Sequence, residues 1–233
     1  MTSPALALAK QQLRTFVREC LKSVPEESIV SQSKTLFDTL MDFPPYVEAS
    51  RISIFLSMPH SEVQTQEIVR HSLQSGKMVF IPYLHKTPPH LDVDVKRVMD
   101  MVHIRDLKDY ESLQPDKWGI PSLDPQTVHT RNRVLGDAVE PVDLSSLDLV
   151  LVPGLAFDSN PAGGIKRMGH GRGFYDLFLD RYASLSPRPP LALYGLGLTE
   201  QYLPNLSPRH ELPTGHQDKI LDGLILGNGS IIQ

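Results

Sequence analysis

Apolar residues recur at helical spacing near the start of the chain, and this spacing predicts two helices. The first helix covers residues 4–22. Its apolar stripe consists of Leu6, Leu13, Phe16, Val17, Cys20 and Leu21. The second begins at residues 25–27, because proline is tolerated in the first helical turn, and ends near Met41. The same spacing recurs far along the chain and predicts another helix that begins between residues 171 and 173. Its stripe consists of Phe174, Leu177, Phe178 and Tyr182.

Short apolar runs rich in β-branched residues predict buried strands. These runs cover residues 51–57, 78–83, 147–153, 192–198 and 223–226. A helix that ends near Gly76 separates the first two runs, which predicts a strand–helix–strand unit with a right-handed crossover. Residues 90–98 alternate apolar and polar positions, as in a half-exposed strand near a sheet edge. We therefore expect an α/β fold with a mostly parallel sheet.

Residues 105–146 are the least regular part of the chain, because they are rich in proline, charge and polar residues. Much of residues 124–145 is expected to be a surface insertion. No internal repeat and no clear linker divides the sequence, so we expect residues 1–233 to form a single domain.

Composition narrows the class of protein. The 233 residues are 40% hydrophobic and 21% charged, as in an ordinary soluble globular protein. A net charge of −4 without a long basic run disfavours a nucleic-acid partner, and no apolar run reaches the roughly 18 residues of a membrane span. Cys20 is the only cysteine, which excludes an internal disulfide and a cysteine-based zinc site. We expect a cytoplasmic monomer, and a mitochondrial location stays open because the N-terminus is poor in acidic residues.

A glycine-rich basic segment, NPAGGIKRMGHGRGFYDLFLD, covers residues 160–180 and leads directly into the predicted third helix. Its basic residues are Lys166, Arg167 and Arg172. Closely spaced glycines let a loop backbone present its N–H groups, and a helix N-terminus favours an anion such as phosphate. The spacing does not match a P-loop, because His170 stands at the position of the P-loop lysine, and GHGRG is not a dinucleotide-binding motif. The segment is either a polyphosphate site or a flexible surface loop with a basic edge.

Other charged residues each allow two interpretations. Lys10 and Arg14 lie four residues apart on one helical face, and from this segment alone they are better explained as a solvated basic edge. Glu62 follows the first strand, where it either meets a ligand or interacts with the dipole of the next helix. Asp176 lies in the first turn of the helix after the glycine-rich segment, as either a Mg²⁺ ligand or a helix cap.

The sequence RMGHGRGFYD, residues 167–176, resembles the signature of the 5-formyltetrahydrofolate cyclo-ligase family, also called methenyltetrahydrofolate synthetases. Further pieces agree in order along nearly the whole chain. They are Lys10 with Arg14, RISIFLSM with Glu62 shortly after it, WGIP, LVLVPGLAFD, and DKILD at residues 218–222. Compared with the family pattern, the loop after Met58 is one residue longer, and the segments 124–146 and 203–215 are expanded.

The resemblance implies an α/β/α layered fold of the NagB/RpiA/CoA-transferase-like type. It also implies an ATP- and Mg²⁺-dependent ring closure that converts 5-formyltetrahydrofolate to 5,10-methenyltetrahydrofolate, with ADP and phosphate as products. ATP would transfer its γ-phosphoryl group to the formyl oxygen, and N10 of the folate would then attack the activated carbon.

The resemblance also implies roles for individual residues. The catalytic residues would be Glu62, Arg167, Arg172 and Tyr175. The nucleotide would be bound by Lys10, Arg14, Arg167, Gly169, His170, Gly171, Arg172, Gly173, Phe174 and Tyr175. The folate would be contacted by Phe55, Met58, Glu62, Trp118 and Tyr175. Asp176 and Asp218 would place Mg²⁺.

Two other functions are compatible with these motifs. One is a different ATP-dependent enzyme on the same scaffold, such as a small-molecule kinase. The other is a non-catalytic protein that binds folate or nucleotide. The second is disfavoured because a protein that only binds its ligand does not need metal-binding carboxylates, whereas this chain has the whole set of Lys10, Arg167, Arg172, Asp176 and Asp218. We further expect Arg167 and Arg172 to lie in the loop, so that replacing either would remove little packing.

Overall fold

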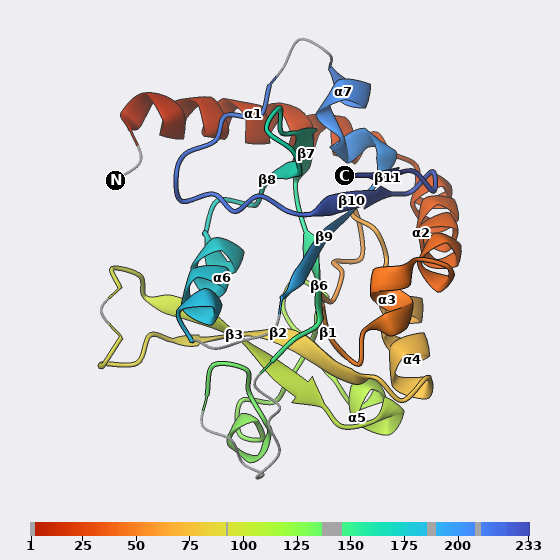
Figure 1. Ribbon diagram of the computed structural model, residues 1–233, viewed down its shortest axis with the longest axis vertical. Coiled ribbons are helices and arrows are strands. Elements are labelled where there is room, and N and C mark those ends of the chain that lie inside the picture. Colours follow the sequence, from red (N-terminus) through yellow and green to blue (C-terminus); the bar gives the residue numbers. More distant parts are fainter. Residues whose placement is uncertain (1–2, 92, 137–145, 186–189, 208–210) are drawn as a thin grey trace.

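The computed structural model describes residues 3–91, 93–136, 146–185, 190–207 and 211–233. Its centre is a seven-stranded sheet with the order β11-β10-β9-β6-β1-β2-β3 (Figure 1). The strands are β1 (Arg51–Ile54), β2 (Met78–Lys86), β3 (Arg97–Ile104), β6 (Leu149–Pro153), β9 (Ala192–Gly197), β10 (Gly223–Leu226) and β11 (Ile231–Ile232). All neighbouring strands from β2 to β10 pair in parallel, and the edge strands β3 and β11 are antiparallel. The predicted α/β fold with a mostly parallel sheet is confirmed.

Without β11, the sheet reads β3-β2-β1-β6-β9-β10 from its other edge. If these strands are numbered 1 to 6 along the chain, this is the doubly wound order 3-2-1-4-5-6. The order reverses between β1 and β6, which are neighbours in the sheet. The chain leaves these two strands in opposite directions, and sheets of this kind bind ligands beyond the carboxyl ends of such strands. We therefore expect a ligand site near the loops that follow Ile54 and Pro153.

Helices cover both faces of the sheet, as Figure 1 shows with α6 on one side and α2 to α4 on the other. The first face carries α1 (Pro4–Lys22), α2 (Glu26–Met41), α3 (Pro44–Glu48) and α4 (Gln66–Gln74). The second face carries α6 (Phe174–Ser184). Alternate residues of β6 face opposite sides of the sheet and pack in different hydrophobic cores. Leu149 and Leu151 pack in the core that α1 to α4 cover, whereas Val150 and Val152 pack with Phe178 of α6. This alternation follows from the two-residue repeat of a strand.

Smaller elements complete the described chain. They are α5 (Leu107–Glu111), α7 (Leu203–Leu206), two short 3₁₀ turns (Val128–Thr130 and Thr199–Gln201), the two-stranded pair β4 (Gln114–Pro115) and β5 (Pro121–Ser122), and the hairpin β7 (Ala156–Ser159) and β8 (Ile165–Met168). No described helix is long and apolar enough to cross a membrane.

Two predictions about the middle of the chain are wrong in part. The strand expected over residues 90–98 begins only at Arg97 and continues to Ile104, where it forms the antiparallel edge beside β2. The segment 124–145 was expected to be a surface insertion. Its described part packs on the sheet: Val128 and Val134 are buried, and Val134 bonds to Met101 of β3. Residues 137–145 lie outside the described residues.

Candidate active site

The glycine-rich segment forms the hairpin β7–β8 and then a tight loop, residues 169–173, that leads into α6. Gly171 and Gly173 have φ values of 104° and 67°, which side-chain-bearing residues rarely adopt. The backbone N–H groups of residues 169–176 donate no hydrogen bond within the described chain, and no side chain caps α6. A row of free donors at the positive end of a helix dipole suits an anion.

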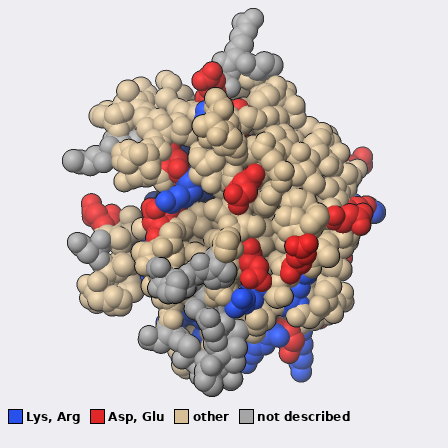
Figure 2. Space-filling view, viewed as in Figure 1, with Lys and Arg blue, Asp and Glu red and all other residues tan. Residues whose placement is uncertain are grey.

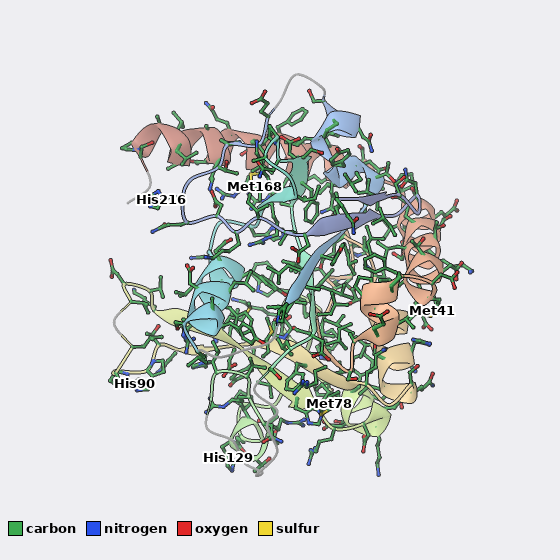
Figure 3. All side chains as sticks on the ribbon, viewed as in Figure 1. Met41, Met78, His90, His129, Met168 and His216 are labelled. Atoms are coloured by element: carbon green, nitrogen blue, oxygen red, sulfur yellow. The ribbon has the colours of Figure 1, made fainter. Side chains whose placement is uncertain are left out.

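Helix α1 lies along this loop and directs basic side chains toward it. The Nε group of Arg14 donates to the carbonyl of Gly169 over 3.0 Å, and Lys10 Nζ donates to both carboxylate oxygens of Asp218 over 2.6 and 2.5 Å. Figure 3 shows Met168, at the end of β8, and His216, in the loop before β10, both beside α1. The interpretation of Lys10 and Arg14 as a solvated basic edge is therefore wrong.

Arg167 belongs to β8 and is buried, so the expectation that it lies in a loop is also wrong. Its Nη1 donates to the carbonyl of Pro153, the last residue of β6, and its Nη2 pairs with Asp176 Oδ2 over 3.1 Å. Its guanidinium carbon lies 5.4 Å from the centre of the Tyr175 ring. The Arg167 Nε and Tyr175 Oη atoms are buried without a hydrogen-bond partner in the described chain. Two unsatisfied donors at the switch point indicate a place for a ligand with acceptor atoms.

Glu62 lies in the loop after β1, with 6% of its surface exposed. Its Oε1 accepts a 2.5 Å hydrogen bond from the backbone N–H of Met58. Burial raises the pKa of the Glu62 carboxyl to about 7, and the Met58 hydrogen bond opposes this rise. The helix-dipole interpretation does not hold, because α4 begins only at Gln66, with Thr65 as its N-cap.

Tyr175 lies against Arg167 and close enough to Glu62 for the charges of both residues to affect its hydroxyl. Burial raises the pKa of the Tyr175 hydroxyl, while the nearby Arg167 charge lowers it and the Glu62 charge raises it. The phenol is therefore neutral and can act as a hydrogen-bond donor. The buried side chains of Glu62 and Arg167 and the buried hydroxyl of the half-buried Tyr175 thus interact at the switch point, although they come from separate segments of the chain.

The two aspartates predicted to bind Mg²⁺ belong to segments that are in contact. Asp176 is in the first turn of α6, and its Oδ1 accepts from the backbone N–H of Lys219, which directly follows Asp218. Asp218 also accepts from the N–H of Gly215 over 2.6 Å. Each carboxylate is paired with a cation, namely Arg167 and Lys10 respectively. The described residues contain no group of three or more His, Cys, Asp or Glu suited to a metal. A pair of carboxylates fits Mg²⁺ only when phosphate oxygens and waters complete the octahedron.

The remaining predicted residues differ in exposure. Arg172 and His170 are exposed in the loop and form no ion pair with described residues, and Phe174 is half-buried against the core beneath α6. Phe55 is packed in the main core, and Met58 is half-buried. Trp118 is 64% exposed. It stands on a turn whose Gly119 lies so close to Pro59 that a Cβ there would come within 2.7 Å of the proline ring. The Trp118 turn therefore lies beside the Glu62 loop.

Two residues at the site escaped the sequence analysis. Gln201 is buried and donates from Nε2 to the carbonyl of Gly154, just beyond β6, over 2.6 Å. Arg18 continues the basic face of α1 by one more turn and donates to the carbonyl of His170 over 3.4 Å. The sequence around Gln201 does not mark it as a site residue, because its partner, Gly154, is distant in the chain. Arg18 could have been found by extending the four-residue spacing of Lys10 and Arg14.

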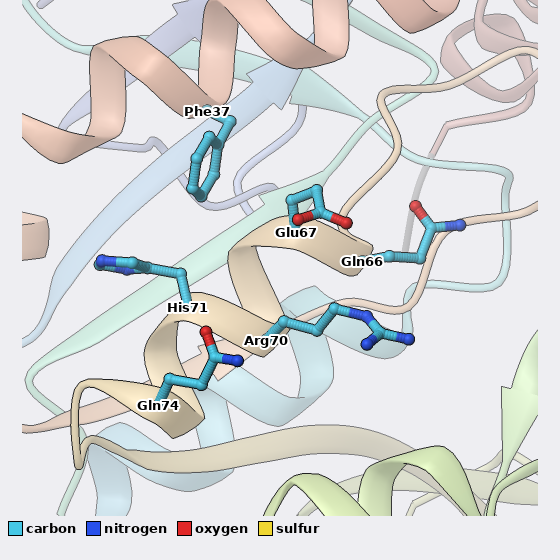
Figure 4. A pocket seen from close by; sticks show the side chains of 6 residues that line it. All are labelled: Phe37, Gln66, Glu67, Arg70, His71 and Gln74. Carbon is cyan, nitrogen blue, oxygen red and sulfur yellow. The ribbon is translucent and has the colours of Figure 1, made fainter.

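A surface hollow elsewhere does not compete with this site. It is lined by Phe37, Gln66, Glu67, Arg70, His71 and Gln74, which Figure 4 shows on α4 and the neighbouring α2. Two of its polar side chains already have partners: Arg70 pairs with Glu111, and His71 bonds to the hydroxyl of Tyr46. In Figure 2, acidic side chains are spread over the visible face of the molecule, and several basic side chains gather near its lower end.

The fold and the site together define an α/β protein with a basic, amide-lined helix N-terminus at the switch point of its sheet. The model of the 5-formyltetrahydrofolate cyclo-ligase family matches residues 7–226, and the chain belongs to this family. It is 29% identical to the 5-formyltetrahydrofolate cyclo-ligase of Saccharomyces cerevisiae, over 95% of this chain and 97% of that protein. It is 28% identical to the mouse 5-formyltetrahydrofolate cyclo-ligase, over 97% of each chain.

A solved structure has the same fold. The Aquifex aeolicus 5,10-methenyltetrahydrofolate synthetase superposes with a TM-score of 0.62 and 18% identity, over 96% of this chain and 92% of that one. The sequence-based assignment to the family is confirmed, as is the α/β architecture.

Proposed function

We propose that this protein uses ATP to close the ring of 5-formyltetrahydrofolate, with 5,10-methenyltetrahydrofolate, ADP and phosphate as products. The proposal agrees with the family to which the chain belongs. The observation that carries it is the row of free N–H groups at residues 169–176, which includes the N–H of Tyr175, whose buried hydroxyl interacts with the buried Glu62 and Arg167. An anion site thus adjoins a dry site with a titratable carboxyl, as phosphoryl transfer to a second substrate requires.

The chemistry explains why the reaction needs ATP. An amide oxygen is a poor leaving group, so the formyl oxygen first attacks the γ-phosphorus, and the bond from that phosphorus to ADP breaks. N10 then forms a bond to the formyl carbon and loses its proton, and the carbon–oxygen bond breaks to release phosphate. Both steps depend mainly on positioning and on neutralising negative charge.

The site can supply both requirements. Lys10, Arg14 and Arg172 would bind the phosphates together with the loop N–H groups. Arg167 Nε and Tyr175 Oη would donate hydrogen bonds to the formyl oxygen that receives the phosphoryl group, because these two atoms have no other partner in the described chain. Glu62, whose pKa of about 7 allows either protonation state, would bind the folate near its reacting nitrogens and accept the N10 proton.

The folate ring system needs apolar neighbours on the Glu62 side of the site. Met58 and Trp118 would supply them, because the Trp118 turn packs against the loop that carries Glu62. Phe55 would contribute from the core side, since it is almost fully buried. The exposed indole of Trp118 is free to cover a bound ring. The strand order also supports placing the fold in the NagB/RpiA/CoA-transferase-like group.

Turnover with 5-formyltetrahydrofolate tests the proposal directly. We expect the purified protein to form 5,10-methenyltetrahydrofolate, followed by its ultraviolet absorbance, with one ADP released per product. Phosphorylation of another small molecule without methenyl product would favour a kinase. Binding of ATP or folate without any turnover would favour a protein that only binds its ligands.

A second prediction concerns Mg²⁺, which would neutralise the phosphate charge. We expect Asp176→Asn and Asp218→Asn each to raise the Mg²⁺ concentration needed for turnover and for ATP binding. The double variant should be less than additive, because both changes affect one ion. Mg²⁺ titrations of the rate and of calorimetric ATP binding, with all four proteins, measure this. Folate binding alone should stay unchanged.

The ion pairs of the two aspartates lead to a further expectation about Mg²⁺ binding. Asp218 is held by Lys10 and Asp176 by Arg167, so phosphate must attract these cations before the carboxylates can bind metal. We therefore expect neither aspartate to bind Mg²⁺ well without nucleotide. If only the Asp176 variant shifts the titration, Asp218 serves to hold its loop against α1 and is not a metal ligand.

A further inference from the structure

Three glycines lie near the carboxyl ends of the neighbouring strands β6 and β9. Gly154 directly follows β6, and Gly195 and Gly197 belong to β9. None of the three has a positive φ, so the backbone conformation does not require glycine at these positions. A glycine inside a strand weakens it and often marks a place where another group approaches closely. The three glycines are therefore explained by what packs against them.

The aromatic ring of Phe157 packs against all three glycines. A Cβ at Gly154, Gly195 or Gly197 would lie only 2.5, 2.7 or 3.0 Å from a carbon atom of this ring. Phe157 is fully buried and belongs to β7, the first strand of the hairpin that carries Arg167. We call the three glycines the glycine seat, because they let the ring rest directly on the backbone at the ends of β6 and β9.

Phe157 and Arg167 lie directly opposite each other in the hairpin β7–β8. Opposite residues of an antiparallel pair project to the same side, so the two side chains are neighbours. With the ring on the glycine seat, Arg167 Nη1 donates to the carbonyl of Pro153 over 3.2 Å, and Nη2 pairs with Asp176. The closeness of the Phe157 ring to the sheet thus determines how far Arg167 reaches toward the switch point.

Other contacts hold the same hairpin without involving the ring. The backbone of Phe157 forms a bridge with Tyr202, and the hydroxyl oxygens of Ser159 and Tyr202 lie 2.7 Å apart. The backbone N–H of Leu155 donates to the carbonyl of Met168 over 2.7 Å. These bonds do not depend on the size of the Phe157 side chain. A smaller side chain should therefore leave the hairpin attached and change only its distance from the glycine seat.

We propose that Phe157 is a positioning residue, whose ring on the glycine seat holds Arg167 in its place at the active site. The proposal rests on the proposed function, in which Arg167 Nε donates a hydrogen bond to the formyl oxygen that receives the phosphoryl group. Phe157 acts only through Arg167, because its own ring is enclosed in the core. A shift of about 1 Å in a group that positions the reacting atoms can lower the rate about 100-fold. The effect of the ring should therefore appear in kcat.

Substitutions on both sides of the contact test the proposal, with kcat and the KM for 5-formyltetrahydrofolate measured for each variant. We expect Phe157→Leu and Gly195→Ala each to lower kcat by about 10- to 100-fold, whereas the KM should change less than about threefold. Phe157→Leu leaves the glycine seat partly empty, and Gly195→Ala pushes the ring away from it. The double variant should be about tenfold faster than either single variant, because the added methyl group fills the space that the smaller side chain leaves.

Crystal structures of these four proteins give a measurement that does not depend on activity. The distance from Arg167 Nη1 to the carbonyl oxygen of Pro153 is 3.2 Å in the parent. We expect this distance to exceed about 3.5 Å in both single variants and to return to the hydrogen-bond range in the double variant. A parent protein that does not convert 5-formyltetrahydrofolate contradicts the proposed function, and this distance still decides the role of Phe157.

Phe80→Leu is the matched control. Phe80 is fully buried in the same hydrophobic core as Phe157, but it lies on β2, and its ring is 5.3 Å from the ring of His103. Both substitutions should lower the thermal unfolding temperature to a similar extent, because both remove ring atoms from one core. Only Phe157→Leu should lower kcat.

The proposal is overturned if Phe157→Leu keeps either the parent kcat or the parent distance between Arg167 and Pro153. It is also overturned if Phe80→Leu loses as much rate, because the loss would then follow from lower stability, or if the double variant is no faster than the single variants. If Gly195→Ala does not fold, Gly197→Ala replaces it in the same comparison, since its Cβ would also meet the Phe157 ring.

Discussion

Replacing Glu62 by glutamine is expected to lower turnover by about 100- to 10,000-fold while Mg-ATP binds with nearly parent affinity. The carboxyl lies in the loop after β1, outside the glycine-rich loop and α1, and it is the buried acid whose charge raises the pKa of Tyr175. Glutamine has the same shape and keeps the hydrogen bond from Met58, so the loop should not move. Steady-state rates and calorimetry with a non-hydrolysable ATP analogue measure the two effects separately.

The same variant has a predicted pH signature in stability. Because the pKa of Glu62 rises from 4.5 to about 7 on folding, the folded state binds the proton more tightly than the unfolded state. Stability from the protonated carboxyl is thus fully present below pH 4.5 and is lost as the pH rises to about 7. A shift of this size corresponds to about 3 kcal/mol. Glu62→Gln should therefore be more stable than the parent at pH 8, and the difference should disappear below pH 4.5.

Glu67→Gln provides the control for both measurements. Glu67 is exposed in the first turn of α4, so the same chemical change should affect neither turnover nor the pH dependence of unfolding. A parallel loss of ATP affinity in Glu62→Gln would mean that Glu62 serves the phosphate site or the fold. Equal stabilities of Glu62→Gln and the parent at pH 8 would mean that the buried carboxyl is not destabilised there.

Replacing Arg167 by alanine is expected to lower both stability and ATP affinity. The side chain is 4% exposed, bonds to Pro153 and leaves Asp176 without its cation when removed. Loss of one partner from a buried pair costs about 3–5 kcal/mol, and we expect about 2–3 kcal/mol here because Asp176 is 23% exposed. Urea unfolding at pH 7 measures this cost, and calorimetry under native conditions measures the loss of ATP binding.

Arg172→Ala separates the two effects. Arg172 is exposed and has no ion pair among the described residues, so its removal should change the free energy of unfolding by less than about 0.5 kcal/mol. ATP affinity should still fall about tenfold. If Arg167→Ala unfolds at the same urea concentration as Arg172→Ala, the Arg167–Asp176 pair does not stabilise the fold.

Local patterns determined most of the secondary structure. The apolar stripes of α1 and α2 and the strands β1, β2, β6, β9 and β10 depend on which side chains face the core, and residue spacing records this directly. The edge of the sheet was less predictable. Residues 90–96 alternate in polarity, yet their described part, residues 90–91 and 93–96, forms no strand, because pairing with β2 involves only residues 97–104.

Family membership could also be inferred from the sequence, because the motif at residues 167–176 and its companion pieces span the chain. The partners of the charged residues were decided only by the tertiary structure. Spacing placed Lys10 on a basic helical face and Asp218 near the end of the chain, yet nothing local shows that they form an ion pair. In the same way, the burial of Arg167 beside Tyr175 and the raised pKa of Glu62 arise where distant segments meet at the switch point. The sequence alone could nominate these groups, because their chemistry is local, but their charge state and partners depend on the elements packed around them.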